Sequence, residues 1–544
     1  MLRRHGVGAA TAAAVVLAAV LSWRAIDRAP LNVDEELTRR IASGPFGSIF
    51  STVVNQRGGG PLHFWLIHVT LQWPSGLTGL RTPSLVFFLL ALPAVALVAR
   101  ELAGPAEAAA TVLLTACAPL AVTYATFARP HTLLFAWISW GTYAALRAAR
   151  TDDRAWWIAG GAILGTAVFT HPTAPIYELA AFLAALAFAP QPRRAWPGAA
   201  ALFVTTVPYV AFTAHRLTDR YGVGTSSGHG RTFDGKPVWD NALRALAPNP
   251  HHHLVTWLGA LALAGVVALI AARRYRTLAA IALVVVLPVL FFTYVPAHGL
   301  SAFFFDRYVL PPLPLFLLLA AIGAAGIAQL AQRAWPLVLA GLVAVAIVLQ
   351  IATVQRHAHN LAKLKLDHVT AVVHAQSDDA VLFGSAGTLD ASGSLGVLNF
   401  GRGPNLLDRY LSLRIPSLPL VNDDTCVPVA AFLAGAEARH GLFLFYADAP
   451  AQQAAAASAF AKLSGVRVTV PAPRYFLLRT RALRPRALVV LALQIRRTWI
   501  AAEPANPRAG DLIDADRQAL AATCVPRGPL GDPDISPHFP EVVT

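Results

Sequence analysis

Apolar segments of membrane length recur along the first two-thirds of this 544-residue chain. They fall at roughly 8–23, 83–99, 106–123, 132–149, 155–170, 173–190, 198–214, 254–271, 277–295, 308–330 and 336–354. Most of them approach the ~20 residues that an α-helix needs to cross a bilayer. Only 13% of the residues are charged, against 56% that are hydrophobic, and a soluble protein of this size needs more charge to cover its surface. The sequence therefore predicts an all-α polytopic membrane module of about eleven transmembrane helices.

The basic residues predict how this module is oriented. If Arg3 and Arg4 are cytoplasmic and the spans alternate, most other short basic clusters fall on the same side. These clusters are at Arg100, 147–154, 193–194, 273–276 and Arg333. Because cytoplasmic loops carry the excess of Lys and Arg, we expect a multi-pass protein of the plasma (inner) membrane with a cytoplasmic amino terminus. The connections 27–81 and 215–253, and everything after about Gln355, are then extracytoplasmic.

A change in the pattern of apolar residues near residue 355 divides the chain into two domains. Residues 1–355 form the membrane module, with the external loops 27–81 and 215–253. Residues 356–544 show short strand-like runs and one helix-like stretch, which indicates a smaller α/β extracytoplasmic domain. The strand-like runs are at 380–384, 442–446 and 475–479, and the helix-like stretch is at 451–463.

The net charge of +15 does not indicate a nucleic-acid partner. The arginines are distributed between loops, where orienting charge and contact with anionic lipid headgroups explain them. Of the three cysteines, Cys117 lies inside an apolar run and is expected to pack in the core. Cys426 and Cys524 both fall in the predicted external region, where a disulfide persists, and we expect a bridge between them.

Three consecutive carboxylates, Asp34, Glu35 and Glu36, directly follow the first apolar run. One interpretation is a helix start, in which Asn32 is the cap and Glu35 completes an arrangement similar to a capping box. The other is catalytic, because a carboxylate at this boundary can act as general base toward a sugar hydroxyl. The two interpretations are compatible, since a capped helix would hold the base in place.

Two arginines near the predicted outer surface are candidates for binding a phosphate group. Arg129 lies in a very short turn between two spans, and Arg307 follows Asp306 just before another span. A guanidinium group can bind phosphate through a pair of parallel hydrogen bonds and stabilise its charge. The alternatives are an arginine that reaches toward lipid headgroups for Arg129 and a local ion pair for Asp306 and Arg307.

Several histidines accumulate on the same predicted side, among them His63 and His131, which we regard as candidate contacts for a polar substrate. No spacing typical of zinc ligands is present, and the sequence predicts no metal site. It also lacks a Walker loop and a strand-embedded GxGxxG motif. No cofactor is therefore expected, and a divalent metal has no support.

In their order along the chain, several short motifs resemble the C-type (GT-C) glycosyltransferases of family 39. The motifs begin with the acidic pair and continue through Pro61-Leu62-His63-Phe64, Gly79-Leu80-Arg81-Thr82-Pro83-Ser84, Ala128-Arg129-Pro130-His131 and Asp306-Arg307-Tyr308-Val309-Leu310-Pro311. Relatives in this group include protein O-mannosyltransferases, lipid A aminoarabinose transferases and rhizobial lipopolysaccharide sugar transferases. The resemblance covers about residues 1–330.

This resemblance implies a sugar donor carried on a polyprenyl phosphate and transfer on the extracytoplasmic face. It places Asp34 at the position of the family's catalytic aspartate, Glu35 as its acidic neighbour and Arg129 at the donor phosphate. The chain departs from the family in having Gly60-Pro61-Leu62-His63 and no second acid in the turn at 124–131. The missing acid weakens the case for a metal.

The sequence therefore predicts an inverting glycosyltransferase of a hexose or pentose, with Asp34 as general base. Its partners would be a polyprenyl-phosphate sugar, membrane lipids and the hydroxyl of a glycan, lipid or protein acceptor. One alternative is a transporter of lipid-linked glycans, which needs charged groups deep within the spans, where Glu178 is the main acidic residue. The other is a non-catalytic assembly subunit that binds glycan.

Overall fold

The structure, a computed structural model, describes eleven main stretches of the chain and several isolated short ones. They are residues 2–26, 33–57, 60–72, 76–221, 252–297, 306–362, 380–384, 417–419, 437–446, 450–471, 475–484 and a few short stretches between 368 and 498. Cys426 and Cys524, the predicted disulfide, and most of the predicted loop 215–253 lie outside the described residues. By their internal contacts the residues form two compact units, one of 1–29 and 37–360, the other of 30–36 and 361–544.

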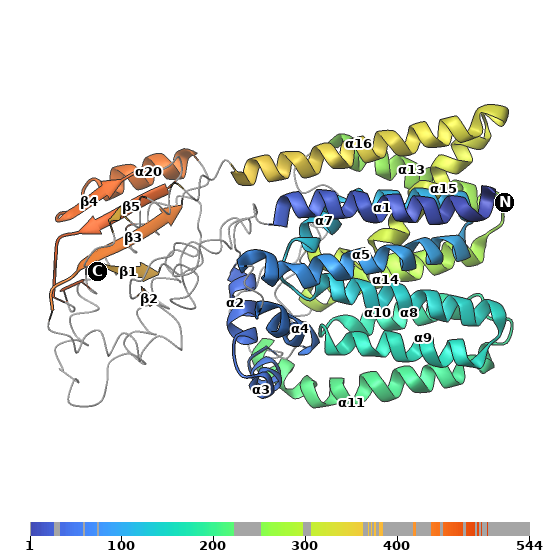
Figure 1. Ribbon diagram of the computed structural model, residues 1–544, viewed down its shortest axis with the longest axis horizontal. Helices are drawn as coiled ribbons and strands as arrows, with labels where there is room; N and C mark the ends of the chain where they lie inside the picture. Colours follow the sequence, from blue (N-terminus) through green and yellow to red (C-terminus); the bar gives the residue numbers. More distant parts are fainter. Residues whose placement is uncertain are drawn as a thin grey trace. The chain divides into compact units, whose positions relative to one another are not determined.

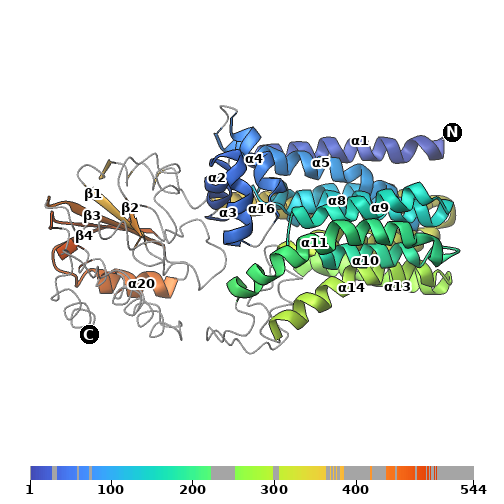
Figure 2. The same cartoon turned by 90° about the horizontal axis from the view of Figure 1, so that it is seen from below.

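The first unit is a helical bundle. Its helices are α1 (Leu2–Ile26), the larger part of α2 (Val33–Ala42), α3 (Phe46–Arg57), α4 (Leu62–Leu71), α5 (Gly76–Leu102), α6 (Pro105–Cys117), α7 (Pro119–Ala125), α8 (His131–Thr151), α9 (Arg154–Thr166), α10 (Ala174–Leu186), α11 (Trp196–Tyr221), α13 (His252–Ala271), α14 (Tyr275–Ala297), α15 (Leu313–Gln329) and α16 (Trp335–Ala362). Four 3₁₀ turns connect them: η1 (Ala167–Phe169), η2 (Pro192–Ala195), η3 (Asp306–Val309) and η4 (Gln332–Ala334). The long helices α1, α5, α8, α9, α11 and α14 run side by side in both views (Figures 1 and 2).

Six of these helices are long and apolar enough to cross a membrane within the described part of the chain, namely α1, α5, α11, α13, α14 and α16. The number rises to seven if the bent pair α6–α7 forms one span. The helices α4, α10 and α15 are apolar but shorter. The protein is therefore mostly helical and crosses the membrane several times, while the count of about eleven spans stays a prediction.

Close helix contacts in the bundle depend on residues without a side chain. A Cβ atom on Gly265 of α13 would lie 2.0 Å from the carbonyl oxygen of Leu319, and one on Gly323 of α15 would lie 1.9 Å from that of Leu261. Small residues are used in this way between membrane helices because the helices gain their attraction from close van der Waals contact. The two helices are thus held in direct backbone contact.

Two arginines have a structural role in the bundle. Arg81 belongs to one of the family motifs, and Arg274 belongs to the basic cluster 273–276. Arg81 is fully buried and donates from Nη1 to the carbonyl oxygen of Ile26 at 2.6 Å, at the end of α1. Arg274 donates from Nη2 to the carbonyl oxygen of Leu102 at 2.5 Å, at the end of α5. The last carbonyls of a helix have no partner within it and carry partial negative charge. These cations therefore cap two spans.

The predicted external loop 27–81 contains three helices and the start of α5. The apolar stretch that follows Pro61 forms the short helix α4. The Trp65 ring of α4 stacks on the Phe46 ring of α3 with centroids 5.6 Å apart and on Phe50 at 6.4 Å. In both views α3 and α4 lie at the end of the bundle away from the start of α1 (Figures 1 and 2).

The second unit contains a five-stranded sheet in the order β2-β1-β3-β5-β4. The strands are β1 (Ala380–Gly384), β2 (Ser417–Pro419), β3 (His440–Tyr446), β4 (Val466–Thr469) and β5 (Tyr475–Thr480), with helix α20 (Pro450–Phe460) between β3 and β4. β1 pairs in parallel with β2 and β3, whereas β5 pairs antiparallel with β3 and β4. Three of these strands and α20 coincide with runs read from the sequence. Phe460 of α20 packs edge-on against Phe476 of β5, with ring centroids 5.8 Å apart.

Candidate active site

Five polar side chains from distant parts of the sequence meet in the helical bundle. We call this set, which consists of His63, Arg129, His131, His171 and Arg307, the histidine–arginine cluster. His131 interacts electrostatically with the four others, and its ring centroid lies 5.3 Å from that of His171. The five residues come from α4, the α7–α8 turn, the start of α8, the η1–α10 turn and η3. The structure thus brings together four residues that the sequence suggested separately, and it adds His171.

Gly60 fixes the approach of α4 to the cluster. A Cβ atom at this position would lie 2.0 Å from both the carbonyl carbon and the carbonyl oxygen of Phe169, and 2.4 Å from the amide nitrogen of Thr170. No side chain fits in this space, because a Cβ atom would overlap the backbone. The glycine of the Gly60-Pro61 sequence therefore lets the start of α4, and with it His63, lie directly against the end of η1.

The turn that carries Arg129 is set by a broken helix. Ala118 has an extended backbone before Pro119, as residues before proline prefer, and the α6–α7 pair is bent by 56°. After α7 the amide of Arg129 donates to the carbonyl oxygen of Phe127 at 2.7 Å. Ser84 of α5 donates through its hydroxyl to the carbonyl oxygen of Arg129 at 3.4 Å. The Arg129 backbone is thus held from two sides.

His63 is neutral at physiological pH. Burial lowers the pKa of His63 to about 3; a hydrogen bond to the Ala128 backbone opposes this change, and the charge of Arg129 adds to it. The Nε2 atom is buried and has no hydrogen-bond partner among the described residues. We therefore assign the bond with the Ala128 carbonyl to Nδ1–H. In this tautomer Nε2 presents a lone pair.

His171 has the opposite tautomer. The amide of Thr173 donates to His171 Nδ1 at 3.2 Å, and the Thr173 hydroxyl lies 2.7 Å from the same atom. An amide can only donate, so Nδ1 is the acceptor and the ring proton is on Nε2. Burial, followed by the charges of Arg307 and Arg129, lowers the pKa of His171 to about 3. His171 is therefore a neutral ring that can donate from Nε2.

Several buried polar atoms beside the cluster lack a partner. Among the described residues none forms a hydrogen bond with His63 Nε2, His131 Nε2 or the hydroxyl of Thr170. A buried donor or acceptor without a partner costs about 1–3 kcal/mol. Such groups call for an explanation, and a polar ligand at this place would supply one.

Aromatic contacts hold Arg307 at the cluster. The ring of its neighbour Tyr308 stacks on Phe292 of α14, with centroids 4.5 Å apart and planes at 17°. The Tyr177 hydroxyl of α10 donates to the Tyr308 carbonyl oxygen at 2.7 Å. The guanidinium carbon of Arg307 lies 5.8 Å from the centre of the Tyr308 ring. The centroids of the His171 and Tyr308 rings lie 6.2 Å apart. These contacts tie η3 to two helices of the bundle.

The acidic residues of the sequence begin a helix. Asp34 and Glu35 lie in the first turn of α2, and the Glu35 side chain is buried. Asn32, the predicted cap, lies outside the described residues. The residues 30–36 belong to the second unit, so the roles of both acids stay predictions. Asp306, the other acidic candidate, lies in η3.

No group of three or more potential metal ligands occurs within the part of the chain that the structure describes. The histidines of the cluster are also surrounded by two arginine charges, which disfavour a cation. The chemistry that these residues can provide is hydrogen bonding and positive charge, which suits a phosphate group.

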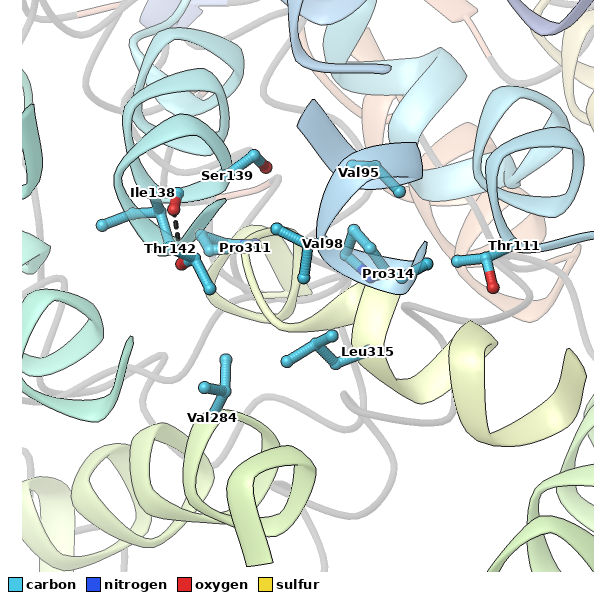
Figure 3. Close-up of a pocket in the computed structure, with 11 residues that line it drawn as sticks. Val95, Val98, Thr111, Ile138, Ser139, Thr142, Val284, Pro311, Pro314 and Leu315 are labelled. Carbon is cyan, nitrogen blue, oxygen red and sulfur yellow. Dashed lines mark hydrogen bonds between the residues drawn. The ribbon is translucent and has the colours of Figure 1, made fainter. Parts of the chain in front are cut away.

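A small cavity lies deeper in the same bundle, between α5, α6, α8, α14 and the start of α15 (Figure 3). Its volume is about 20 Å³, which is room for about one water molecule. The Thr142 hydroxyl on its wall donates to the carbonyl oxygen of Ile138 at 2.6 Å, the bond drawn in Figure 3. The Thr111 hydroxyl likewise donates to the carbonyl oxygen of Glu107 in its own helix at 2.7 Å. This cavity is a packing void, too small for a lipid chain.

Comparison with known proteins finds a family model that matches part of the chain. Residues 58–214 match the family model described as dolichyl-phosphate-mannose-protein mannosyltransferase. The matched segment includes all members of the histidine–arginine cluster except Arg307. No curated protein sequence matches the chain.

Two similar solved structures are those of ArnT from Cupriavidus metallidurans. The apo structure has a TM-score of 0.52 and 16% sequence identity, over 86% of this chain and 97% of ArnT. The structure bound to undecaprenyl phosphate has a TM-score of 0.50, with the same identity and coverage. At this identity the likeness establishes the fold.

Proposed function

From the premise that this chain has the fold of the GT-C membrane glycosyltransferases, we propose that it transfers a sugar from a polyprenyl-phosphate donor to an acceptor hydroxyl. The observation that carries the proposal is the histidine–arginine cluster, in which two arginines and three histidines lie together within a membrane bundle. The family match of residues 58–214 and the binding of undecaprenyl phosphate by ArnT support a lipid-phosphate donor.

The charges of the cluster suit a departing phosphate. The histidines His63 and His171 are neutral, so the positive charge there comes from Arg129 and Arg307. A sugar linked to polyprenyl phosphate is a diester with one negative charge, whereas the monoester that leaves carries about −2 at neutral pH. Two guanidinium groups in a water-poor site therefore stabilise the leaving group more than the bound donor, which is what catalysis requires.

Asp34 is proposed as the general base. It removes the proton of the acceptor hydroxyl while the hydroxyl oxygen forms a bond to the anomeric carbon. The bond between this carbon and the phosphate oxygen breaks, and its electron pair leaves with polyprenyl phosphate. Displacement from the opposite face inverts the anomeric centre. Glu35 supports the base, and His131 and Asp306 contact polar parts of the substrate.

The proposal extends to topology. We infer about eleven spans, a plasma-membrane location, a cytoplasmic amino terminus and transfer on the extracytoplasmic side, where the 356–544 α/β domain lies. The acceptor is a glycan, lipid or protein of the cell envelope. With about eleven spans the polyprenyl tail can lie between membrane helices, while the sugar faces the aqueous side.

The transporter alternative relied on Glu178 as a charged group inside the spans. In the bundle the Glu178 side chain is buried, and it accepts a hydrogen bond from the Thr206 hydroxyl at 2.7 Å. This contact joins α10 to α11, so the acid has a structural role. A non-catalytic subunit would bind the lipid-linked sugar without transferring it, whereas our proposal requires transfer.

The test uses the purified full chain in proteoliposomes, with radiolabelled undecaprenyl-phosphate mannose, glucose, galactose and arabinose as donors and membrane extract as acceptor. We expect transfer from one of them by the wild type and a loss of at least about a hundredfold in Asp34→Asn. Glu36→Gln, two positions along the same acidic run, is the matched control and should transfer normally. Binding without turnover would favour the non-catalytic subunit, and full activity of Asp34→Asn would remove the base assignment.

A further inference from the structure

Two neutral histidines of the cluster, His63 and His171, offer opposite hydrogen-bonding atoms. His63 bonds to the Ala128 backbone, so its Nε2 atom carries a lone pair. His171 accepts the Thr173 amide at Nδ1, so its Nε2 atom carries the proton. Both rings interact with Arg129. The cluster therefore contains one histidine that can accept a hydrogen bond and one that can donate one.

The His63 side requires a ligand group that donates. Nε2 of His63 is buried and has no partner among the described residues, although its ring is held by the bond to Ala128. A phosphate diester has oxygens that only accept, and an accepting lone pair repels them. A sugar hydroxyl, in contrast, carries a proton that it can donate.

We propose that His63 Nε2 accepts a hydrogen bond from a hydroxyl group of the donor sugar, while His171 Nε2–H donates to a phosphate oxygen. This inference rests on the proposed function and adds a residue that determines sugar specificity. An acceptor placed for one hydroxyl is left unpaired by a sugar that lacks this hydroxyl, and such a site rejects the analogue.

Two other roles for the His63 lone pair fit the structure less well. A metal ion would need further ligands, and no group of three candidates occurs among the described residues. A general base would have to take the proton, but burial and Arg129 keep the pKa of His63 near 3. At neutral pH the ring therefore accepts a hydrogen bond without becoming protonated.

The first experiment compares the donor sugar found in the panel above with its mono-deoxy analogues. In the wild type we expect one deoxy position to lower kcat/KM about tenfold, the size of one lost hydrogen bond. In His63→Phe the complete donor should lose the same factor, and that deoxy donor should lose nothing more. His63→Gln, which retains an accepting oxygen, should keep most of the discrimination.

The matched control is His68→Phe. His68 lies five residues further along α4, and its Nδ1 atom is 2.7 Å from the Ala42 carbonyl oxygen. We expect this variant to discriminate between the donors as the wild type does. Loss of discrimination in both variants would mean that any disturbance of α4 has this effect, and it would overturn the inference.

The second experiment measures binding of undecaprenyl phosphate, which has the phosphate but no sugar. His63→Phe should bind it within about twofold of the wild type, whereas His171→Phe should bind it about tenfold more weakly. Equal weakening by both substitutions would place His63 at the phosphate and contradict the inference. If His63→Phe does not fold, the deoxy series is measured on the wild type and on His63→Gln. If every deoxy donor then has the kcat/KM of the complete donor, no sugar hydroxyl is recognised and the inference is contradicted.

Failure of this inference differs from failure of the proposed function. If the wild type transfers no sugar from any lipid donor, the function is wrong. If it transfers sugar but the loss of kcat/KM with each deoxy donor is the same in the wild type and in the His63 variant, only the specificity role is wrong.

Discussion

The histidine–arginine cluster and the cavity of Figure 3 lie in the same bundle, yet their polar atoms have opposite environments. The cavity's threonine hydroxyls bond to carbonyl groups of their own helices, as Thr142 does to Ile138. In the cluster, His63 Nε2 and His131 Nε2 are buried with no partner among the described residues. Hydroxyls that a helix satisfies itself serve packing, whereas the atoms without a partner in the cluster lie beside two arginines, where a polar ligand would satisfy them.

The largest effect that separates the two regions is expected from Arg129→Gln. Removal of a charge that stabilises the leaving phosphate should lower kcat by about 10²–10³-fold. The measurement is transfer from the lipid-linked donor in proteoliposomes, at equal amounts of folded protein. Ser139→Ala, on the cavity wall, is the control and should remain within about twofold. If Arg129→Gln were as active as Ser139→Ala, the cluster would have no catalytic meaning.

The next effect concerns how the cluster is assembled. Gly60→Ala should lower the free energy of unfolding by about 3 kcal/mol or more, because its Cβ atom would overlap the Phe169 carbonyl. Thermal unfolding in detergent measures this change. Gly259→Ala in α13 is the matched control, since a Cβ atom there meets nothing within 4 Å. Equal melting temperatures for the two variants would show that α4 is not fixed by this contact.

A third effect is the pH dependence of stability. The folded-state pKa values of His63 and His171 are about 3, below the ordinary 6.5, so the unfolded chain binds more protons between these values. Stability should therefore fall as pH decreases from about 6.5 toward 3, by about 2 kcal/mol for each histidine on reaching pH 5.

Melting curves at pH 7.5 and pH 5 measure this dependence, and His171→Asn should reduce it by about 2 kcal/mol, because one of the titrating histidines is removed. His131, whose pKa burial also lowers, contributes to the dependence in both proteins, and Arg129 and Arg307 stay charged throughout. A dependence of the same size in the wild type and in His171→Asn would contradict the buried neutral state of His171.

The smallest effect is expected in the cavity. Thr142→Val removes a hydroxyl whose partner is a carbonyl of its own helix, so stability should change by less than about 1 kcal/mol. Transfer activity should stay within about twofold. A large loss of activity would indicate that the cavity takes part in substrate binding, and the contrast between the two regions would disappear.

Much of the fold follows from local sequence patterns. Continuous apolar runs predicted the membrane helices, because a span must satisfy its backbone internally and be apolar over its whole length. Proline positions fixed helix starts such as Pro105 and Pro119. The strands β1, β3 and β5 and the helix α20 also coincide with runs read from the sequence. The chain shares the fold of ArnT, and residues 58–214 match the mannosyltransferase family model.

The site was less accessible to sequence reasoning. Arg129, Arg307, His63 and His131 were proposed one by one, from the polarity of residues beside apolar runs, but no local pattern shows that they meet. His171 has no feature in the sequence that singles it out as a member of the site. The sequence Thr170-His171-Pro172-Thr173 breaks an apolar run, and that interruption was the available signal. Gly60 was seen as a departure from a family motif, and its reason is the Phe169 contact.

The sequence by itself determined that this is a membrane protein with polar candidates at the ends of its spans, because hydrophobicity and chain breaks are local properties. Only the tertiary structure decided which candidates share a site and in which form. Whether a histidine is charged, and which nitrogen holds its proton, depends on burial and on partners such as Ala128 and Thr173. Those contacts join residues far apart in the chain, and no local pattern specifies them.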